Sequence, residues 1–180
     1  MKYVVNKKNE FFFDSRNLKI SVLFVCFGNI CRSPTSEAVF KKLVKDMDLS
    51  NNVTIDSAGT HVFDGGEKFD ERAKKIALKR GYDLSDHISR QFTASDFSKF
   101  DLILAMDWEN LALLQRMAPR HHSHKLHLLM RYATNTEAAE IPDPFSGGSK
   151  EFDLALNYIE DACQGLFENI CRRASINAAA

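Results

Sequence analysis

The sequence predicts a single-domain α/β fold of three layers, with a central, mostly parallel four-stranded sheet flanked by helices on both faces. Short, almost continuously apolar runs alternate along the chain with longer segments whose apolar residues recur at helical spacing. The chain has 180 residues, a length that suits one domain with a substantial core. We expect this domain at residues 19–173, after an extension of unknown role at residues 1–18 and before a disordered tail at residues 174–180.

Four apolar runs are expected to form the strands. The first, at residues 19–26, reads KISVLFVC and is apolar and β-branched, as in a strand buried on both faces. Ligands of open parallel sheets bind beyond the carboxyl ends of the strands. Cys26 ends the first strand and Asp143 lies in a loop after the fourth, so both stand where chemistry is expected. The other three strands are expected at residues 53–57, 100–106 and 125–130.

Helices are expected between these strands. Pro34 suits the first position of a helix, with Ser33 as its cap. Asp107 can cap a later helix, and a last helix is expected to begin near Ser149. Residues 141–148 contain two prolines and two glycines, which excludes regular structure and predicts a loop.

Composition excludes several functional classes. The formal net charge is zero, so the chain has no global basic field for nucleic acid. Its most apolar stretch, at residues 20–27, is far shorter than the ~20 residues that span a bilayer. Its first residues lack the ~7–15-residue apolar region of a signal peptide. We therefore expect a cytoplasmic protein that binds neither nucleic acid nor membrane, with free thiols at Cys26, Cys31, Cys163 and Cys171.

Residues 25–34, VCFGNICRSP, join a strand to the start of a helix. Backbone N–H groups of such a loop can converge on an anion, helped by the helix dipole, and Gly28 lets the backbone come close to it. Arg32 has a planar fork that matches two phosphate oxygens. Cys26 stands at the mouth of the same cradle, whose positive groups would stabilise its thiolate. A thiolate facing bound phosphorus is a nucleophile in position, which predicts covalent phosphoryl transfer.

The nine residues at 26–34, CFGNICRSP, resemble the signature of the low-molecular-weight protein tyrosine phosphatases. The resemblance covers residues 20–172, nearly the whole chain. It continues in four further segments, at residues 56–60, 87–91, 101–107 and 142–145. It implies an enzyme that hydrolyses phosphotyrosine in proteins through a phosphocysteine intermediate and releases inorganic phosphate.

The resemblance also implies a catalytic role for each of three residues. Cys26 would be the nucleophile, Arg32 the phosphate ligand, and Asp143 the general acid and then the base. This chemistry requires no metal and no other cofactor, and its optimum is expected on the acid side of neutrality, where Asp143 is protonated and Cys26 ionised. By the same resemblance, the phosphate-binding loop would comprise Phe27, Gly28, Asn29, Ile30, Cys31 and Ser33 around the nucleophile.

Supporting roles follow from the same resemblance. Ser33 would donate a hydrogen bond to the Cys26 thiolate. Asn29 would hold the loop in a strained turn, steadied by His87. Cys31 would be a redox partner that pairs with Cys26 under oxidation, a use that also makes chemical sense for a thiol beside an exposed thiolate.

The pocket walls are expected to select an aryl phosphate. Ile30 lies inside the cradle, and Phe63 and Phe145 stand at wall positions by the resemblance. The related arginine phosphatases typically carry threonine at the position of Ile30, so the isoleucine favours phosphotyrosine. Many relatives have tyrosines after the Asp-Pro, where this chain has Phe145 and Ser146, which removes those hydroxyl groups.

Other interpretations stay open at this point. An arsenate reductase of the same fold would need a relay of further cysteines, and none occurs between Cys31 and Cys163. A phosphoprotein-binding module without turnover would not need a nucleophile or an acid. The histidines at positions 121, 122, 124 and 127 are a weak metal signal without accompanying carboxylates or cysteines. The physiological substrate and the oligomeric state have no signature in the sequence.

Overall fold

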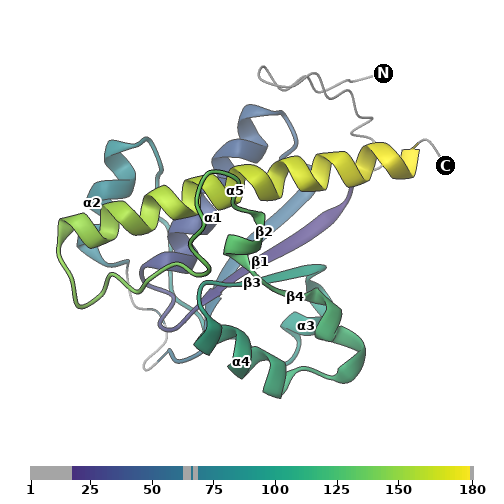
Figure 1. Cartoon of the computed structure of the whole chain (residues 1–180), viewed down its shortest axis with the longest axis horizontal. Helices are drawn as coiled ribbons and strands as arrows, with labels where there is room; N and C mark the ends of the chain where they lie inside the picture. Colours follow the sequence, from purple (N-terminus) through teal and green to yellow (C-terminus); the bar gives the residue numbers. More distant parts are fainter. Residues whose placement is uncertain (1–17, 63–65, 67–68, 179–180) are drawn as a thin grey trace.

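A computed structural model describes residues 18–62, 66 and 69–178 of the chain. Four strands form one sheet in the order β2-β1-β3-β4, and each neighbouring pair is parallel (Figure 1). The predicted fold class is therefore confirmed. The strands are β1 (Ile20–Cys26), β2 (Val53–Gly59), β3 (Leu102–Ala105) and β4 (Leu126–Leu128).

Helices cover both faces of this sheet. Two long helices, α1 (Arg32–Asp46) and α5 (Ser149–Ala178), pack against each other on one face, and α2 (Glu71–Lys79) packs beside α5 (Figure 1). The other face carries α3 (Asp96–Lys99) and α4 (Trp108–Met117). Two short 3₁₀ turns flank β4, and they are η2 (Arg120–Lys125) and η3 (Leu129–Tyr132).

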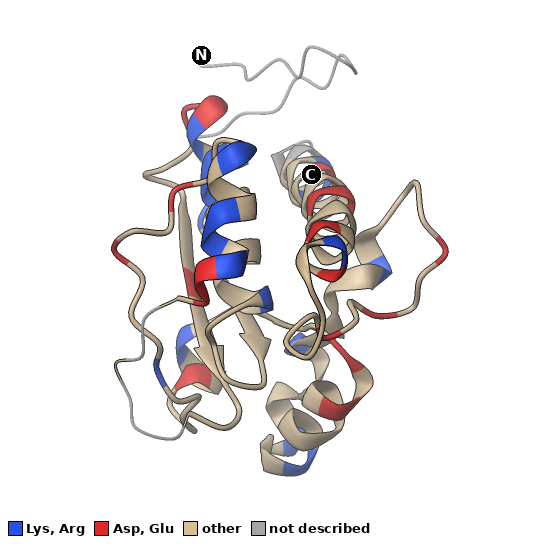
Figure 2. Ribbon diagram, turned by 90° about the vertical axis from the view of Figure 1, so that its left-hand side faces the viewer, with Lys and Arg blue, Asp and Glu red and all other residues tan. Residues whose placement is uncertain are grey.

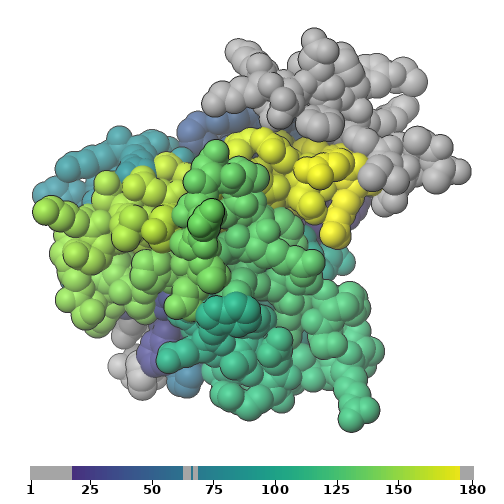
Figure 3. Space-filling model, in the orientation of Figure 1, coloured from purple at the N-terminus to yellow at the C-terminus, as the bar shows by residue number. Residues whose placement is uncertain are grey.

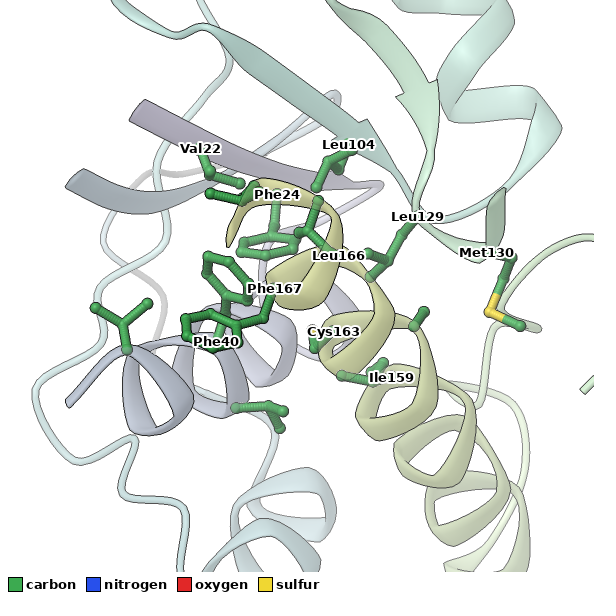
Figure 4. Packing of buried hydrophobic residues seen from close by; sticks show 14 of the residues in the cluster. Val22, Phe24, Phe40, Leu104, Leu129, Met130, Ile159, Cys163, Leu166 and Phe167 are labelled. Atoms are coloured by element: carbon green, nitrogen blue, oxygen red, sulfur yellow. The ribbon is translucent and has the colours of Figure 1, made fainter. Parts of the chain in front are cut away.

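The side chains of β1 divide between two cores. Val22 and Phe24 point into the core under α1 and α5. Leu23 and Val25 point into the core under α3 and α4, because successive side chains of a strand alternate between faces. Every one of these four side chains is fully buried. Figure 4 shows the larger core, which joins the sheet to both helices through Phe24, Phe40, Cys163, Leu166 and Phe167.

The expected cap of the first helix is wrong. α1 begins at Arg32, and its N-cap residue is Cys31, which makes no side-chain cap hydrogen bond. The hydroxyl of Ser33 instead lies 3.0 Å from the sulfur of Cys26. The Ser33 hydroxyl, which was expected to cap the helix, therefore contacts the Cys26 sulfur instead. Pro34 still falls in the first turn, where a missing N–H costs no helical hydrogen bond.

Ordered structure extends slightly beyond residues 19–173 at both ends. Leu18 is buried, and its carbonyl accepts a hydrogen bond from Asn52 Nδ2 at 2.9 Å. α5 continues to Ala178, past residue 173, because neither proline nor glycine interrupts the helix there. Residues 1–17 and 179–180 lie outside the described residues. The fourth strand is shorter than expected, because the chain turns into η3 directly after Leu128.

After η3 the chain crosses the outer side of α5, as the green segment over the yellow helix in Figures 1 and 3. Gly165 makes the crossing possible, since a Cβ at this position would lie 1.9 Å from the carbonyl oxygen of Tyr132. Asp161 of α5 accepts hydrogen bonds from the backbone of Thr134 and Asn135 at 3.2 and 3.1 Å. The crossing leads into residues 141–148, which form the expected loop.

Charged residues of both signs share the surface. On the face drawn in Figure 2, both Lys or Arg and Asp or Glu occur on the helices, in keeping with the net charge of zero. Among the described helices, none is long and apolar enough to cross a membrane.

Candidate active site

The loop between β1 and α1 begins at the carboxyl end of β1, which is one of the two inner strands of the sheet. The neighbouring chain supports it, because Thr60 N donates to the carbonyl of Cys26 at 2.9 Å and His61 N donates to that of Phe27 at 2.8 Å. Gly59 is required at the end of β2, since a Cβ there would lie 2.7 Å from the Phe27 carbonyl oxygen. The His61 ring stacks on the Phe27 ring with centroids 4.6 Å apart.

The sulfur of Cys26 meets a buried hydroxyl. Cys26 Sγ lies 3.0 Å from Ser33 Oγ, and Asn29 Nδ2 donates to the same oxygen at 3.0 Å. With the oxygen accepting from Asn29, the Ser33 proton is free to point at the sulfur or at the Ala58 carbonyl, 3.3 Å away. The local arrangement therefore offers a hydrogen bond to a Cys26 thiolate.

Asn29 holds the turn of the loop from several sides. Its φ is 56°, in the left-handed region that asparagine tolerates better than most residues, and its side chain is fully buried. Its Oδ1 accepts from Arg90 N at 2.9 Å, and its Nδ2 also donates to Ser57 Oγ at 2.9 Å. His87 Nε2 lies 2.8 Å from the Asn29 carbonyl oxygen.

Arg32 is buried and forms ion pairs with two carboxylates. Nη1 donates to Asp107 Oδ2 at 2.6 Å and to the carbonyl of Ile141 at 3.0 Å, and Nη2 donates to Asp143 Oδ2 at 2.5 Å. Burial acts to lower the pKa of Arg32, but the Cys26 thiolate and the carboxylates of Asp143 and Asp107 outweigh it and raise that pKa. The guanidinium is thus a fixed positive charge at the base of the site.

Cys26, Arg32 and Asp143 line one cavity of about 510 Å³. Asp143 is about half exposed within it, at 47%, and its Oδ1 accepts from Phe145 N at 3.1 Å. A thiol, a buried guanidinium and an accessible carboxyl therefore face the same space. The rest of the lining comes from Phe27, Gly28, Ile30, Cys31, His61, Phe145 and Ser146.

The family described as low molecular weight phosphotyrosine protein phosphatase matches this chain over residues 21–176. The chain belongs to this family. It is 41% identical over 161 residues to a low molecular weight protein-tyrosine-phosphatase of Streptomyces coelicolor, covering 88% of this chain and 98% of the relative. It is also 41% identical over 150 residues to the low molecular weight phosphotyrosine protein phosphatase of Rattus norvegicus, covering 82% of this chain and 94% of the relative.

Comparison with solved structures supports the same family assignment for this low molecular weight phosphatase. A protein tyrosine phosphatase from Entamoeba histolytica, with Hepes in its active site, superposes with a TM-score of 0.81 at 40% identity, covering 84% of this chain and 96% of the other. YfkJ from Bacillus subtilis superposes with a TM-score of 0.82 at 34% identity, covering 88% and 98%. Membership in the family makes this chain an enzyme.

The second thiol of the phosphatase loop lies in a different environment from the first. Cys31 is buried, and burial, followed by the charges of Asp70, Cys26 and Asp143, raises its pKa well above the usual range. Cys31 therefore stays a protonated thiol at neutral pH. Cys163 and Cys171 are buried in the core of the phosphatase, away from the cavity. The expected wall residue Phe63 lies outside the described residues.

Three residues of the phosphatase site are given no role in the site by the sequence. Asp107 is predictable as a helix cap, and it does accept from Asn110 N at 2.7 Å, but its contact with Arg32 has no local signal. Arg90 ties the Asn29 turn to Asp56 and Asp96 through ion pairs of 2.8 and 3.0 Å. His61 lines the cavity only because β2 ends beside the loop.

Proposed function

We propose that this enzyme hydrolyses phosphotyrosine monoesters of proteins through a phosphocysteine intermediate. The observation that carries the proposal is the shared cavity, into which Cys26, Arg32 and Asp143 all open. Its walls favour an aryl group, because Phe27 and Phe145 are 44% and 57% exposed at its rim and Ile30 lies inside. The names of the relatives, which are protein-tyrosine phosphatases, support the same substrate class.

The first step transfers the phosphoryl group to sulfur. The Cys26 thiolate attacks phosphorus in line, and an S–P bond forms as the bond to the phenolic oxygen breaks. Asp143 in its acid form gives its proton to that oxygen, so tyrosine leaves as a neutral phenol. Arg32 and the loop N–H groups stabilise the charge on the equatorial oxygens.

The second step regenerates the enzyme. Asp143, now a carboxylate, takes a proton from a water molecule that attacks phosphorus, and the S–P bond breaks to return the thiolate. Inorganic phosphate leaves. The hydrogen bond offered by Ser33 stabilises the thiolate at the start and the end of the cycle. Since the first step needs a protonated Asp143 and an ionised Cys26, turnover should be greatest on the acid side of neutrality.

We place this activity in the cytoplasm. None of the four cysteines, all of which lie in the described part of the chain, forms a disulfide bond, and reduced thiols persist in reducing compartments. The partners we propose are tyrosine-phosphorylated proteins rather than nucleic acid or membrane, as the balanced surface charge supports.

Hydrolysis of an aryl phosphate in EDTA across the pH range tests the proposal. Wild-type enzyme is compared with Cys26→Ser and with Cys171→Ser, a matched control that changes a core thiol outside the cavity. We expect metal-free turnover that Cys26→Ser abolishes and Cys171→Ser retains, and acid quenching should trap phosphate on protein. Turnover by Cys26→Ser, or its loss in EDTA, would contradict the mechanism. Phosphate binding without turnover at any pH would indicate a binding module instead.

A further inference from the structure

Arg72 lies in the first turn of α2 and reaches the loop that carries Asp143. Its Nη1 donates to the carbonyl of Gly147 at 2.9 Å, and its Nη2 donates to that of Phe145 at 3.0 Å. Its guanidinium also lies over the rings of Phe145 and Phe152, 5.5 and 4.6 Å from their centroids. One side chain thus holds the loop at residues 141–148 by two hydrogen bonds and one cation–π contact, while its second cation–π contact is with Phe152 of α5.

The guanidinium is itself fixed by Asp70. Arg72 Nε donates to Asp70 Oδ1 at 3.1 Å and Nη2 donates to Asp70 Oδ2 at 2.8 Å, a two-point contact that suits the planar fork of arginine. Asp70 Oδ1 also accepts from Arg72 N at 2.8 Å and so caps α2. The Asp70 carboxylate is mostly buried, at 10% exposure, which leaves the arginine one preferred orientation.

Asp70 is tied in turn to the loop of Cys26. Its backbone N–H donates to the carbonyl of Ile30 at 2.9 Å. The start of α2 therefore links the Cys26 loop, through Asp70 and Arg72, to the loop of Asp143. The last link is short, because Phe145 N donates to Asp143 Oδ1 while its carbonyl accepts from Arg72.

We propose that Arg72 is a positioning residue, which orients Asp143 for proton transfer to the leaving oxygen. The inference rests on the proposed role of Asp143 as the acid. Without Arg72, the carbonyls of Phe145 and Gly147 lose their donors, and the loop is free to move relative to Cys26. A carboxyl displaced by about 1 Å from the leaving oxygen transfers its proton less effectively, while attack by sulfur is unaffected.

A series of aryl phosphates with increasingly basic phenolate leaving groups tests this inference. Proton donation matters most for the most basic leaving group, since strongly acidic phenols depart without help. We expect Arg72→Ala to lower kcat/KM, which covers the steps up to departure of the phenol, about tenfold for phenyl phosphate and less than about twofold for dinitrophenyl phosphate. Arg72→Lys keeps the charge and the alkyl chain but not the fork, and it should show a smaller effect in the same direction.

Two further variants complete the experiment. Arg80→Ala is the matched control, because Arg80 ends the same helix and binds Asp153 and Glu160 of α5 without touching the Asp143 loop. Its effect should be equal for all leaving groups. Asp143→Asn is the reference for a lost acid, and Arg72→Ala should add no further leaving-group dependence to it. Thermal unfolding shows which variants are folded.

The outcomes separate this inference from the proposed function. An equal loss for all leaving groups with Arg72→Ala and Arg72→Lys would make Arg72 merely structural, and a rise in KM alone would make it a substrate ligand. Either result overturns the inference if Asp143→Asn still steepens the dependence. If Asp143→Asn leaves the dependence unchanged while Cys26→Ser is inactive, the acid assignment itself fails, and the inference fails with it.

Discussion

Replacing Gly165 by alanine tests how tightly the chain crosses α5. The added Cβ would lie 1.9 Å from the carbonyl oxygen of Tyr132 and 3.3 Å from Cγ2 of Thr134. Carbon and oxygen atoms without a bond between them need more than about 3 Å, so the crossing segment would have to move by at least about 1 Å. The obstacle is a backbone carbonyl, which cannot rotate away as a side chain could.

Two effects of opposite sign decide the outcome of Gly165→Ala. Alanine improves helix propensity by about 1 kcal/mol. Overpacking typically costs about 1–3 kcal/mol, and a clash with backbone belongs at or above the upper end. We expect a net loss of about 2 kcal/mol in the free energy of unfolding. For a chain of this size, that corresponds to a fall of about 4–8 °C in Tm.

The assay for Gly165→Ala is thermal unfolding followed by circular dichroism, with urea unfolding to give the free energy. Leu154→Ala is the control, because Leu154 is an exposed residue of the same helix and the exchange changes propensity little. Its Tm should stay close to that of the wild type. A Gly165→Ala protein as stable as the wild type, or more stable, would refute the reasoning, because the gain in helix propensity would then outweigh any cost of the clash.

Asp107→Asn should keep the cap of α4 but lose the charge facing Arg32, so we expect an almost unchanged Tm and about a tenfold lower kcat on an aryl phosphate. A loss of Tm as large as that of Asp107→Ala would contradict this separation. Asn29→Gly and Asn29→Ala lose the same side-chain hydrogen bonds, but only alanine suffers from the φ of 56°, so urea unfolding should find it about 1 kcal/mol less stable; equal stability would argue against strain. Burial raises the pKa of the Cys163 and Cys171 thiols, the latter to about 12, so the folded state keeps protons that the unfolded state releases above about pH 8.5. Stability should therefore be complete below that pH and fall as pH rises, by about 1.4 kcal/mol per pH unit for each thiol. Urea unfolding should give a shallower fall for Cys163→Ala, and an unchanged slope would disprove the linkage.

Local pattern predicts much of this fold. The parallel sheet follows from apolar runs that alternate with helical spacing, and the β1–α1 loop is recognisable because its residues are contiguous. Contacts between distant residues leave no such trace. Arg32 and Asp107 are 75 positions apart, and nothing near either residue indicates that they meet.

The same limit explains the errors. Ser33 reads as a helix cap because capping is a local rule, whereas its hydroxyl serves Cys26, which only the folded loop brings near. The residues around Arg72 likewise give no sign of its contact with Gly147, 75 positions away. Gly165 reads as a weak point of a helix until the crossing chain above it is known.

The crossing at Gly165 also bears on how the enzyme loses activity. The chain is fastened to α5 before residue 141 and becomes α5 at Ser149, so both ends of the Asp143 loop are attached to one helix. That helix packs along α1, which begins with Arg32. The catalytic parts and the scaffold thus belong to one cooperative unit. In a urea titration, inactivation should coincide with the disappearance of helical circular dichroism, rather than precede it as it does when a site sits on a separately melting lid.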